Sequence, residues 1–159
     1  MHDTRVDLSI TVREKVAPLI QARVADGIDL FTQVKYAHWN VKGPHFLTLH
    51  ELFDRLAGIV AEQVDLLAER LVALGGRVCV TARMVASQST LGEFQLDAID
   101  GLEMAAAVAD KLAAFGKAVR VDIVDATKLG DSNTADLFTE VSREIDKQLW
   151  LVEAHLQAG

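Results

Sequence analysis

Apolar residues recur at every third or fourth position along most of the chain, which is the spacing of one face of an α-helix. Turn signals divide this pattern into four long helical segments and one short one. The only short β-like run, Arg77 to Thr81, lies between two glycines and a polar segment. The sequence therefore predicts an all-α chain. The long helices are expected from Pro18 to Val41, from Thr48 to Gly75, from Leu102 to Gly130 and from Ser132 to the C-terminus, and the short one from Ala82 to Gln88.

Capping residues and proline set these expected boundaries. Pro18 suits a first helical turn, because its missing N–H has no intrahelical partner there. Thr48 is expected to cap the second helix with Glu51 as the other half of a capping box. Ser132 or Asn133 is expected to cap the last helix.

The helices predict a four-helix bundle, with one long crossover between the second and third long helices that contains the short helix. No internal repeat or linker interrupts the 159 residues, so a single domain is expected over residues 1–159, with an N-terminal segment at 1–16 and the helical bundle at 17–157. A bundle by itself does not indicate a chemistry.

Composition and charge narrow the function. The chain is 50% hydrophobic and 25% charged, which is ordinary for a globular protein, and its formal net charge of -7 repels nucleic acid and attracts cations. No apolar run is long enough for a membrane span and no signal-peptide pattern is present, so a cytoplasmic protein is expected. The lone Cys79 has no partner for a disulfide or a zinc site and is interpreted as inert.

The second long helix has a polar face in addition to its core stripe of leucines. Spacings of three and four residues keep six positions on one side of the helix, and four of the six are metal-capable. The two pairs of metal-capable residues cannot share an ion within one chain, because their midpoints are separated by roughly 22 Å along a rigid helix. The six positions are His50, Asp54, Gly58, Ala61, Asp65 and Glu69.

These positions are symmetric about a point between Ile59 and Val60. If a second copy of the helix packs antiparallel across a two-fold axis at that point, His50 and Asp54 of one chain face the acids of the other, and the two small residues meet at the axis. His38 continues the core stripe of the first helix and is a candidate nitrogen ligand for the same site. The alternatives are a solvated charged face on the second helix and a hydrogen-bonded core histidine at position 38.

Several motifs stand out along the chain: Ala37 to Gly43, Leu49 to Glu51 with Asp54, Asp65, Ala68 to Arg70 leading to Gly75 and Gly76, and Asp146 to Trp150. Together they resemble the motifs of the Dps family of mini-ferritins. The resemblance implies a ferritin-like fold and a hollow dodecamer that oxidises Fe(II) to Fe(III), with hydrogen peroxide as the oxidant, at sites that hold up to two ions, and that stores the ferric mineral. It also implies that His38, His50 and Asp54 of one subunit form each ferroxidase centre with Asp65 and Glu69 of the two-fold mate.

Other candidate residues have good structural alternatives. The resemblance suggests that Asp136, with Asp131 or Glu140, lines negative three-fold pores, although acids near a helix N-terminus are also favoured by the helix dipole. Trp39 is a candidate radical trap, with packing as the alternative. Glu62 is a candidate mineral seed or an ordinary surface acid. No glutamate precedes a histidine by three, which disfavours a di-iron centre inside one bundle.

DNA binding is the rival function. It would require clustered Lys or Arg. Residues Met1 to Ser9 contain Arg5 against Asp3 and Asp7, and the C-terminal residues from Ala154 contain no Lys or Arg. This departs from family members with a lysine-rich tail, so iron oxidation is preferred over DNA compaction.

Overall fold

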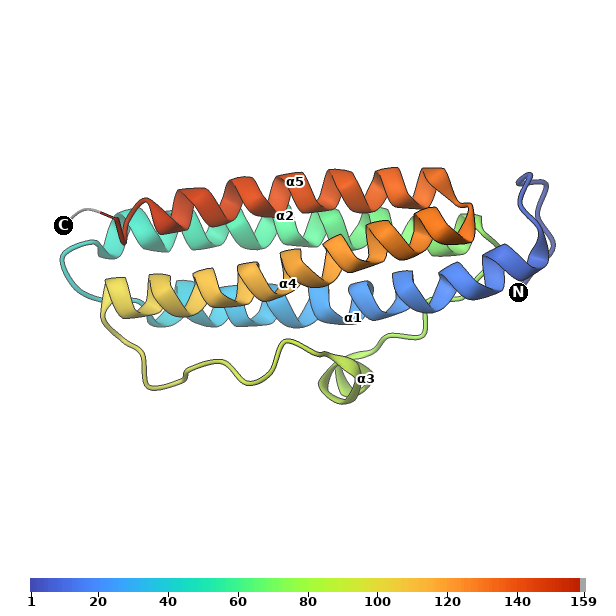
Figure 1. Ribbon diagram of the computed structural model, residues 1–159. Coiled ribbons are helices and arrows are strands. Elements are labelled where there is room, and N and C mark those ends of the chain that lie inside the picture. Colours follow the sequence, from blue (N-terminus) through green and yellow to red (C-terminus); the bar gives the residue numbers. More distant parts are fainter. Residues whose placement is uncertain (158–159) are drawn as a thin grey trace.

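The computed structural model describes residues 1–157, in which four long helices form a bundle and one short helix lies outside it (Figure 1). Helices α1 and α2 pack as one hairpin, α4 and α5 pack as another, and α1 lies against α4. No strand is assigned in this part of the chain, so the predicted all-α four-helix bundle is confirmed. The helices are α1 (Ile10–Asn40), α2 (Phe46–Ala73), α3 (Ala82–Gln88), α4 (Gly101–Leu129) and α5 (Ser132–Glu153).

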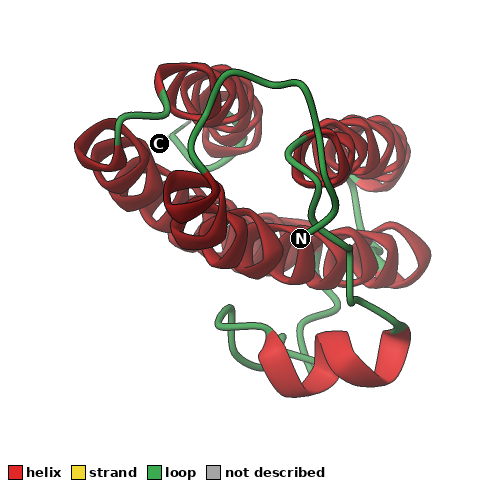
Figure 2. Ribbon diagram, turned by 90° about the vertical axis from the view of Figure 1, so that its right-hand side faces the viewer, coloured by secondary structure: helices red, strands yellow, loops and turns green. Residues whose placement is uncertain are grey.

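The long crossover returns the chain from one end of the bundle to the other, so that α4 runs in the same direction as α2 (Figure 1). Its short helix α3 is seen end-on in Figure 1 and from the side in Figure 2, so the axis of α3 runs across the bundle. The predicted bounds of this helix are confirmed.

Helix α1 begins at Ile10, well before Pro18, so the predicted start was wrong and the N-terminal segment is residues 1–9 rather than 1–16. The Ser9 hydroxyl caps the helix by accepting from the backbone N of Val12 at 3.3 Å. Val16 and Ile20, on either side of the proline, are fully buried. A proline inside a helix costs about 3 kcal/mol, but burying each of these side chains stabilises the helix by about 1.5–3 kcal/mol.

Helix α2 begins at Phe46 after His45, two residues before the predicted cap, and no side chain caps it. Thr48 therefore lies inside the helix, and the predicted capping box was wrong. The end of α2 is as expected: Ala73 is the last residue, and Gly75 takes a positive φ of 82° that suits glycine.

Helix α5 is capped by Asp131, whose carboxylate accepts from the backbone N of Thr134 at 3.0 Å. The prediction of Ser132 or Asn133 as the cap was wrong. The helix ends at Glu153, and the last two residues of the predicted segment, 158–159, lie outside the described residues.

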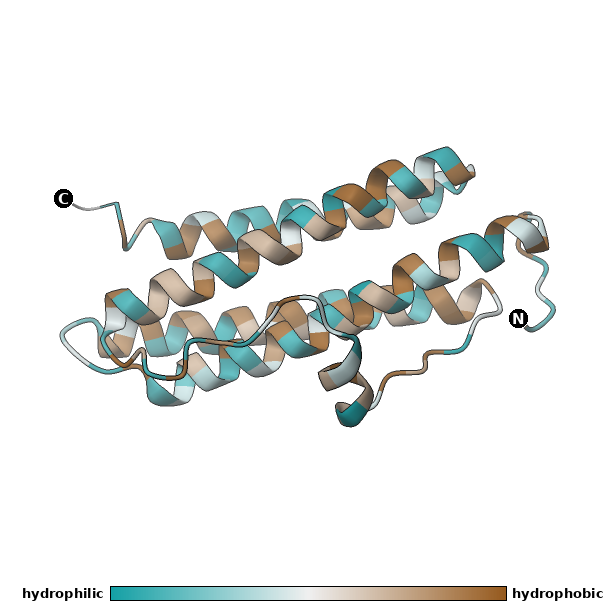
Figure 3. Cartoon of the chain, turned by 60° about the horizontal axis from the view of Figure 1, so that its bottom comes forward, coloured by the Kyte–Doolittle hydropathy of each residue, from teal (hydrophilic) through white to brown (hydrophobic). Residues whose placement is uncertain are grey.

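Hydrophobic and hydrophilic residues alternate around the long helices (Figure 3). The apolar stripes meet in one core, to which α2 contributes Leu49, Leu56 and Leu67 at 0% exposure. Leu66, which the spacing of the leucines also predicts to be in the core stripe of this helix, is 38% exposed, because it lies one helical step away from the buried face.

A buried polar network fastens the crossover to α1 and α4. Asp26 accepts from the backbone N of Thr90 at 2.7 Å and from its hydroxyl at 2.9 Å. Arg23 forms ion pairs with Asp26 at 3.0 Å and, from its Nε, with Asp122 at 3.1 Å. The Arg23 Nε and Asp122 Oδ2 form no hydrogen bond, so the pair is held by charge alone. Burial raises the pKa of Asp122 to about 6, against the attraction of Arg23.

The N-terminal segment lies on the chain's own surface at the end of α2. The backbone N of His2 donates to the Gly75 carbonyl at 2.6 Å. Arg13 donates to the Leu74 carbonyl at 2.9 Å and to the His2 carbonyl at 3.3 Å.

Across the described residues, the long helices are all too polar to cross a membrane.

Candidate metal centre

The two histidines of the candidate site meet at the turn between α1 and α2. His38 lies in the last turn of α1 and His50 near the start of α2. Their rings stack, with centroids 3.9 Å apart and planes 22° apart. The hairpin therefore joins side chains that are 12 residues apart in the sequence.

Two reciprocal hydrogen bonds orient these rings. The Nδ1 of His38 lies 2.8 Å from the His50 carbonyl oxygen, and the Nδ1 of His50 lies 2.8 Å from the His38 carbonyl oxygen. A carbonyl oxygen only accepts, so each Nδ1 carries the hydrogen and donates. In the neutral rings both Nε2 atoms then keep their lone pairs. A histidine that binds a metal through one ring nitrogen typically donates the N–H of its other ring nitrogen in this way.

Asp54 adds a carboxylate next to the histidines. Its Oδ1 lies 3.9 Å from the Nε2 of His38 and 2.7 Å from the Nζ of Lys35. The Asp54 side chain is 58% exposed. The hydrogen bond and charge of Lys35 lower the pKa of Asp54, so this carboxylate is ionised at neutral pH. Lys35 therefore competes with a cation for the Oδ1 atom of Asp54.

Sequence reasoning missed both Lys35 and the paired histidine bonds. Lys35 lies three residues before His38, one helical turn away, and that spacing was the available signal. The histidine bonds have no sequence signal, because they depend on the path of the turn between the two helices.

Asp65 and Glu69 lie farther along α2 and are exposed, and no side-chain hydrogen bond or ion pair holds either one within residues 1–157. Helix α2 continues unbroken past both acids, so they stay far from the histidines in the same chain. In the part of the chain that the structure describes, no three His, Cys, Asp or Glu residues form a group able to hold a metal ion. One chain thus presents two separate halves, and the five-ligand assignment stays a prediction.

Gly58 lies between the two halves on the same face of α2. It is exposed, and a Cβ built at this position meets no atom within 4 Å. Nothing inside the chain therefore requires a small residue there, although glycine weakens a helix interior by about 1 kcal/mol relative to alanine.

The candidate pore acids have different surroundings. Asp131 is 1% exposed, and its oxygens accept from the Nη2 of Arg70 at 2.9 and 3.1 Å, while the Nε of Arg70 donates to the Thr134 hydroxyl. Asp131 is therefore a buried structural residue in this chain, which does not favour a pore role. Asp136 is exposed, and Glu140 lines a cavity between α2 and α5. Their pore role stays a prediction.

The two remaining candidates are open to solvent. Trp39 is 68% exposed, which disfavours the packing alternative within one chain, and the Nζ of Lys35 lies 5.7 Å from the centroid of its ring. Glu62 is exposed at the cavity between α2 and α5. Neither the radical-trap role nor the mineral-seed role is tested by these positions.

Comparisons with known proteins agree with this architecture. Residues 18–159 match the ferritin-like domain family, which defines the class of the bundle. The DNA protection during starvation protein of Agrobacterium fabrum is 35% identical over 156 residues, covering 98% of this chain and 96% of that protein. The corresponding protein 1 of Deinococcus radiodurans is 31% identical over 141 residues, covering 89% of this chain and 68% of that protein. The chain therefore belongs to the Dps family of ferritin-like proteins.

Solved structures support the same family. The tetragonal form of Mycobacterium smegmatis Dps superposes with a TM-score of 0.93 at 28% identity, covering 100% of this chain and 96% of that chain. The Dps protein of Vibrio cholerae O1 superposes with a TM-score of 0.89 at 25% identity, covering 99% and 98% of the two chains. The match extends over the crossover and α3 as well as the bundle.

Proposed function

We propose that this protein is a ferroxidase that oxidises Fe(II) at sites shared between two copies of the chain. The observation that carries the proposal is the His38 and His50 pair, whose reciprocal backbone bonds leave both Nε2 atoms available beside Asp54. No further acid of the same chain completes this group among residues 1–157. The missing ligands must then come from outside the chain.

A second copy supplies them if α2 packs antiparallel against α2 of its partner. His50 then faces the Glu69 position of the mate, Asp54 faces the Asp65 position, and Gly58 faces the Ala61 position. The open space around Gly58 allows the two helices to approach closely at the two-fold axis. Each dimer has two identical sites.

Imidazole and carboxylate ligands suit Fe(II) as the substrate. His38 and His50 bind the first ion. Asp54 and Glu69 bind one ion or bridge the two, and Asp65 binds the second ion more weakly. Two Fe(II) ions each give one electron to hydrogen peroxide, whose O–O bond breaks, and two protons complete two water molecules and leave two Fe(III) ions. Transferring both electrons together avoids release of hydroxyl radical. We propose that the exposed ring of Trp39, next to His38 in the sequence, quenches a stray radical.

The assembly we propose is a hollow dodecamer that stores ferric mineral and protects the cell from oxidative stress. The support is the close match to solved Dps chains, one of which is described as a member of the ferritin-like diiron-carboxylate proteins. Asp136, with Glu140 next to it on α5, is proposed to attract Fe(II) toward the interior, and Glu62 to seed mineral. We propose a cytoplasmic location for this activity, with dioxygen as the alternative oxidant.

The names of the curated relatives raise DNA protection as a second candidate. In this chain the N-terminal segment is tied to the end of α2 by His2 and Arg13 rather than extended as a basic arm. The net charge of -7 also opposes phosphate binding. We therefore expect no DNA retention in a gel shift at low salt and neutral pH, and robust retention would reverse this preference.

Anaerobic Fe(II) titration followed by hydrogen peroxide tests the ferroxidase proposal. We expect His50→Ala and Asp65→Ala each to lower the oxidation rate at least tenfold, since each removes a ligand. Glu103→Gln, an exposed acid at the start of α4, is the matched control and should oxidise iron like the wild type. Equal rates in all four proteins would refute the proposal.

A complementation experiment tests whether the site is shared. Chains with His50→Ala and chains with Asp65→Ala, co-expressed at equal amounts, form mixed dimers in which one of two sites receives both intact halves. Activity should return to about a quarter of the wild-type rate, as two-fold symmetry requires. If each site lay within one chain, mixing two inactive variants would restore nothing.

A further inference from the structure

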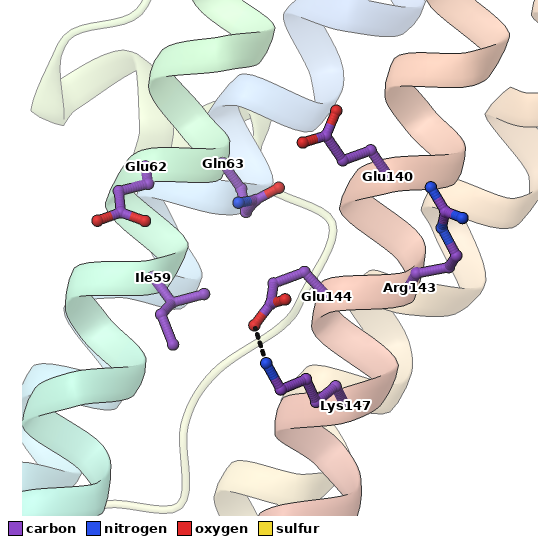
Figure 4. A pocket seen from close by; sticks show the side chains of 7 residues that line it. All are labelled: Ile59, Glu62, Gln63, Glu140, Arg143, Glu144 and Lys147. Carbon is purple, nitrogen blue, oxygen red and sulfur yellow. Dashed lines mark ion pairs between the residues drawn. The ribbon is translucent and has the colours of Figure 1, made fainter.

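A cavity of about 480 Å³ lies between α2 and α5. Figure 4 shows Gln63 of α2 pointing into this space and Glu140 and Glu144 approaching it from α5. Gln63 and the polar face that carries Asp65 lie on opposite sides of α2, because two residues correspond to about 200° around a helix. The cavity is thus separate from the shared site.

Gln63 is a buried polar residue with an unused acceptor. Gln63 is 8% exposed, and its Oε1 has no hydrogen-bond partner within residues 1–157. Buried polar atoms in folded proteins almost always have a partner, because an unpaired one loses its hydration without compensation. A buried oxygen in this state needs a donor or a cation, and the side chain that carries it lines the cavity.

The two carboxylates provide the charge for a cation. Glu140 has no ion pair or side-chain hydrogen bond among the described residues. Glu144 accepts from Gln148 at 2.7 Å, and its nearest cation, the Nζ of Lys147, is 3.7 Å away, which is too far for a hydrogen bond. Lys147 is exposed and long, so it is free to swing away when a cation binds.

We propose that Gln63, Glu140 and Glu144 form a divalent-cation site that is complete within one chain. Two carboxylates and one amide oxygen are hard ligands, which suit Mg(II), Mn(II) or Fe(II) rather than a softer metal. The amide oxygen supplies a third ligand where the carboxylates alone are too few. This site goes beyond the proposed ferroxidase, since it uses no histidine and no residue from a second copy.

Mn(II) titration of the assembled protein tests the site. The His50→Ala variant serves as the background, so that ions bound at the shared site are removed from the count. We expect this background to keep about one Mn(II) per chain, as one three-ligand group per chain implies. Adding Gln63→Leu should weaken that binding at least tenfold, and adding Glu140→Gln should do the same. Adding Glu103→Gln should change nothing.

Gln63→Leu is informative because it leaves the net charge unchanged. If the acids merely attract Mn(II) at long range, Gln63→Leu will bind it like the background, and the site is disproved. Without metal, the Gln63→Leu variant should have a melting temperature no lower than that of the background, because the substitution removes a buried oxygen that had no hydrogen-bond partner. Should it fail to fold, Gln63→Met, which also keeps the net charge and removes the amide oxygen, provides the same test.

Inorganic phosphate separates a cation site from an anion site, because Arg143 and Lys147 also line the cavity. We expect no phosphate binding that depends on Gln63. Phosphate binding that is lost in Gln63→Leu, without Mn(II) binding, would overturn the assignment. Failure of the ferroxidase proposal is recognised separately, by equal iron oxidation in the wild type and His50→Ala.

Discussion

The charged residues at the two ends of α2 differ in where their partners lie. Near its C-terminal end, Arg70 is bound to Asp131 and Thr134 of α5, and the group is complete within the chain. Near its N-terminal end, His50 and Asp54 form a group that is oriented but incomplete. The closed group therefore holds two helices of the fold together, whereas the open group is the one for which we propose a cation and a second chain.

Removing Arg70 should have the largest effect on stability. Arg70→Met leaves the carboxylate of Asp131, which is 1% exposed, without its cation. The free energy of unfolding should fall by about 3–5 kcal/mol, and the melting temperature by about 10 °C. Chemical denaturation and calorimetry measure both.

Glu69→Gln is the neighbouring control, because Glu69 is exposed and has no partner in the described chain. Its unfolding free energy should change by less than about 0.5 kcal/mol, while iron oxidation falls. Equal destabilisation by both substitutions would contradict the distinction between closed and open groups.

Enlarging residue 58 should break the association of two chains and leave the single chain folded. Gly58→Gln has open space in the chain and a better helix propensity, but it would overfill the proposed two-fold contact. We expect the dimer to weaken at least tenfold and iron oxidation to fall with it. Sedimentation equilibrium gives the association constant.

Ala86→Gln, an exposed change of the same kind on α3, serves as the control and should assemble normally. Gly58→Gln chains that assemble and oxidise iron as the wild type does would exclude the proposed axis.

Asp122 should make stability depend on pH. Its pKa is about 6 in the folded chain and 3.8 as the ordinary value, so the folded chain binds the proton more tightly. This contribution is fully present below the ordinary pKa and is lost as the pH rises through about 6. Relative to Asp122→Asn, the wild type should gain about 1–3 kcal/mol of unfolding free energy between pH 7 and pH 4.

Urea denaturation of both proteins at several pH values measures this difference, and acids common to both cancel. If the difference in unfolding free energy between the two proteins is constant across this pH range, burial in the polar network does not raise the pKa of Asp122.

Lys35→Met should have the smallest effect on the fold, because the pair it forms with Asp54 is largely exposed. The melting temperature should hardly change. Mn(II) should bind roughly threefold to tenfold more tightly at the histidines, since no ammonium group competes with it for Asp54. The pKa of Asp54 should also rise toward its ordinary value, because its principal cause of lowering is removed.

Titration calorimetry measures the Mn(II) affinity, and Lys117→Met on α4 is the control for loss of one positive charge. Weaker Mn(II) binding in Lys35→Met would show that Lys35 supports the site instead of competing with the cation.

Local patterns predicted most of the helices and the candidate site. The bounds of α3 and the glycine ends of α2 and α4 followed from turn residues. The start of α1 could not be predicted in this way, because Val16 and Ile20 become buried only when α1 packs in the bundle. The free energy gained by burying them outweighs the cost of Pro18 inside the helix. The cap of α5 could not be predicted either, because Arg70, distant in sequence, is bound to Asp131.

The sequence by itself determined the all-α bundle, its crossover and a face of α2 that carries two separated sets of metal-capable residues, because helical periodicity is a local property. Only the tertiary structure decided the orientation of the His38 and His50 rings and the ion pair between Lys35 and Asp54. It also decided that Asp131 is buried instead of exposed. The physical reason is that these features depend on contacts between helices, and spacing along one helix does not contain that information.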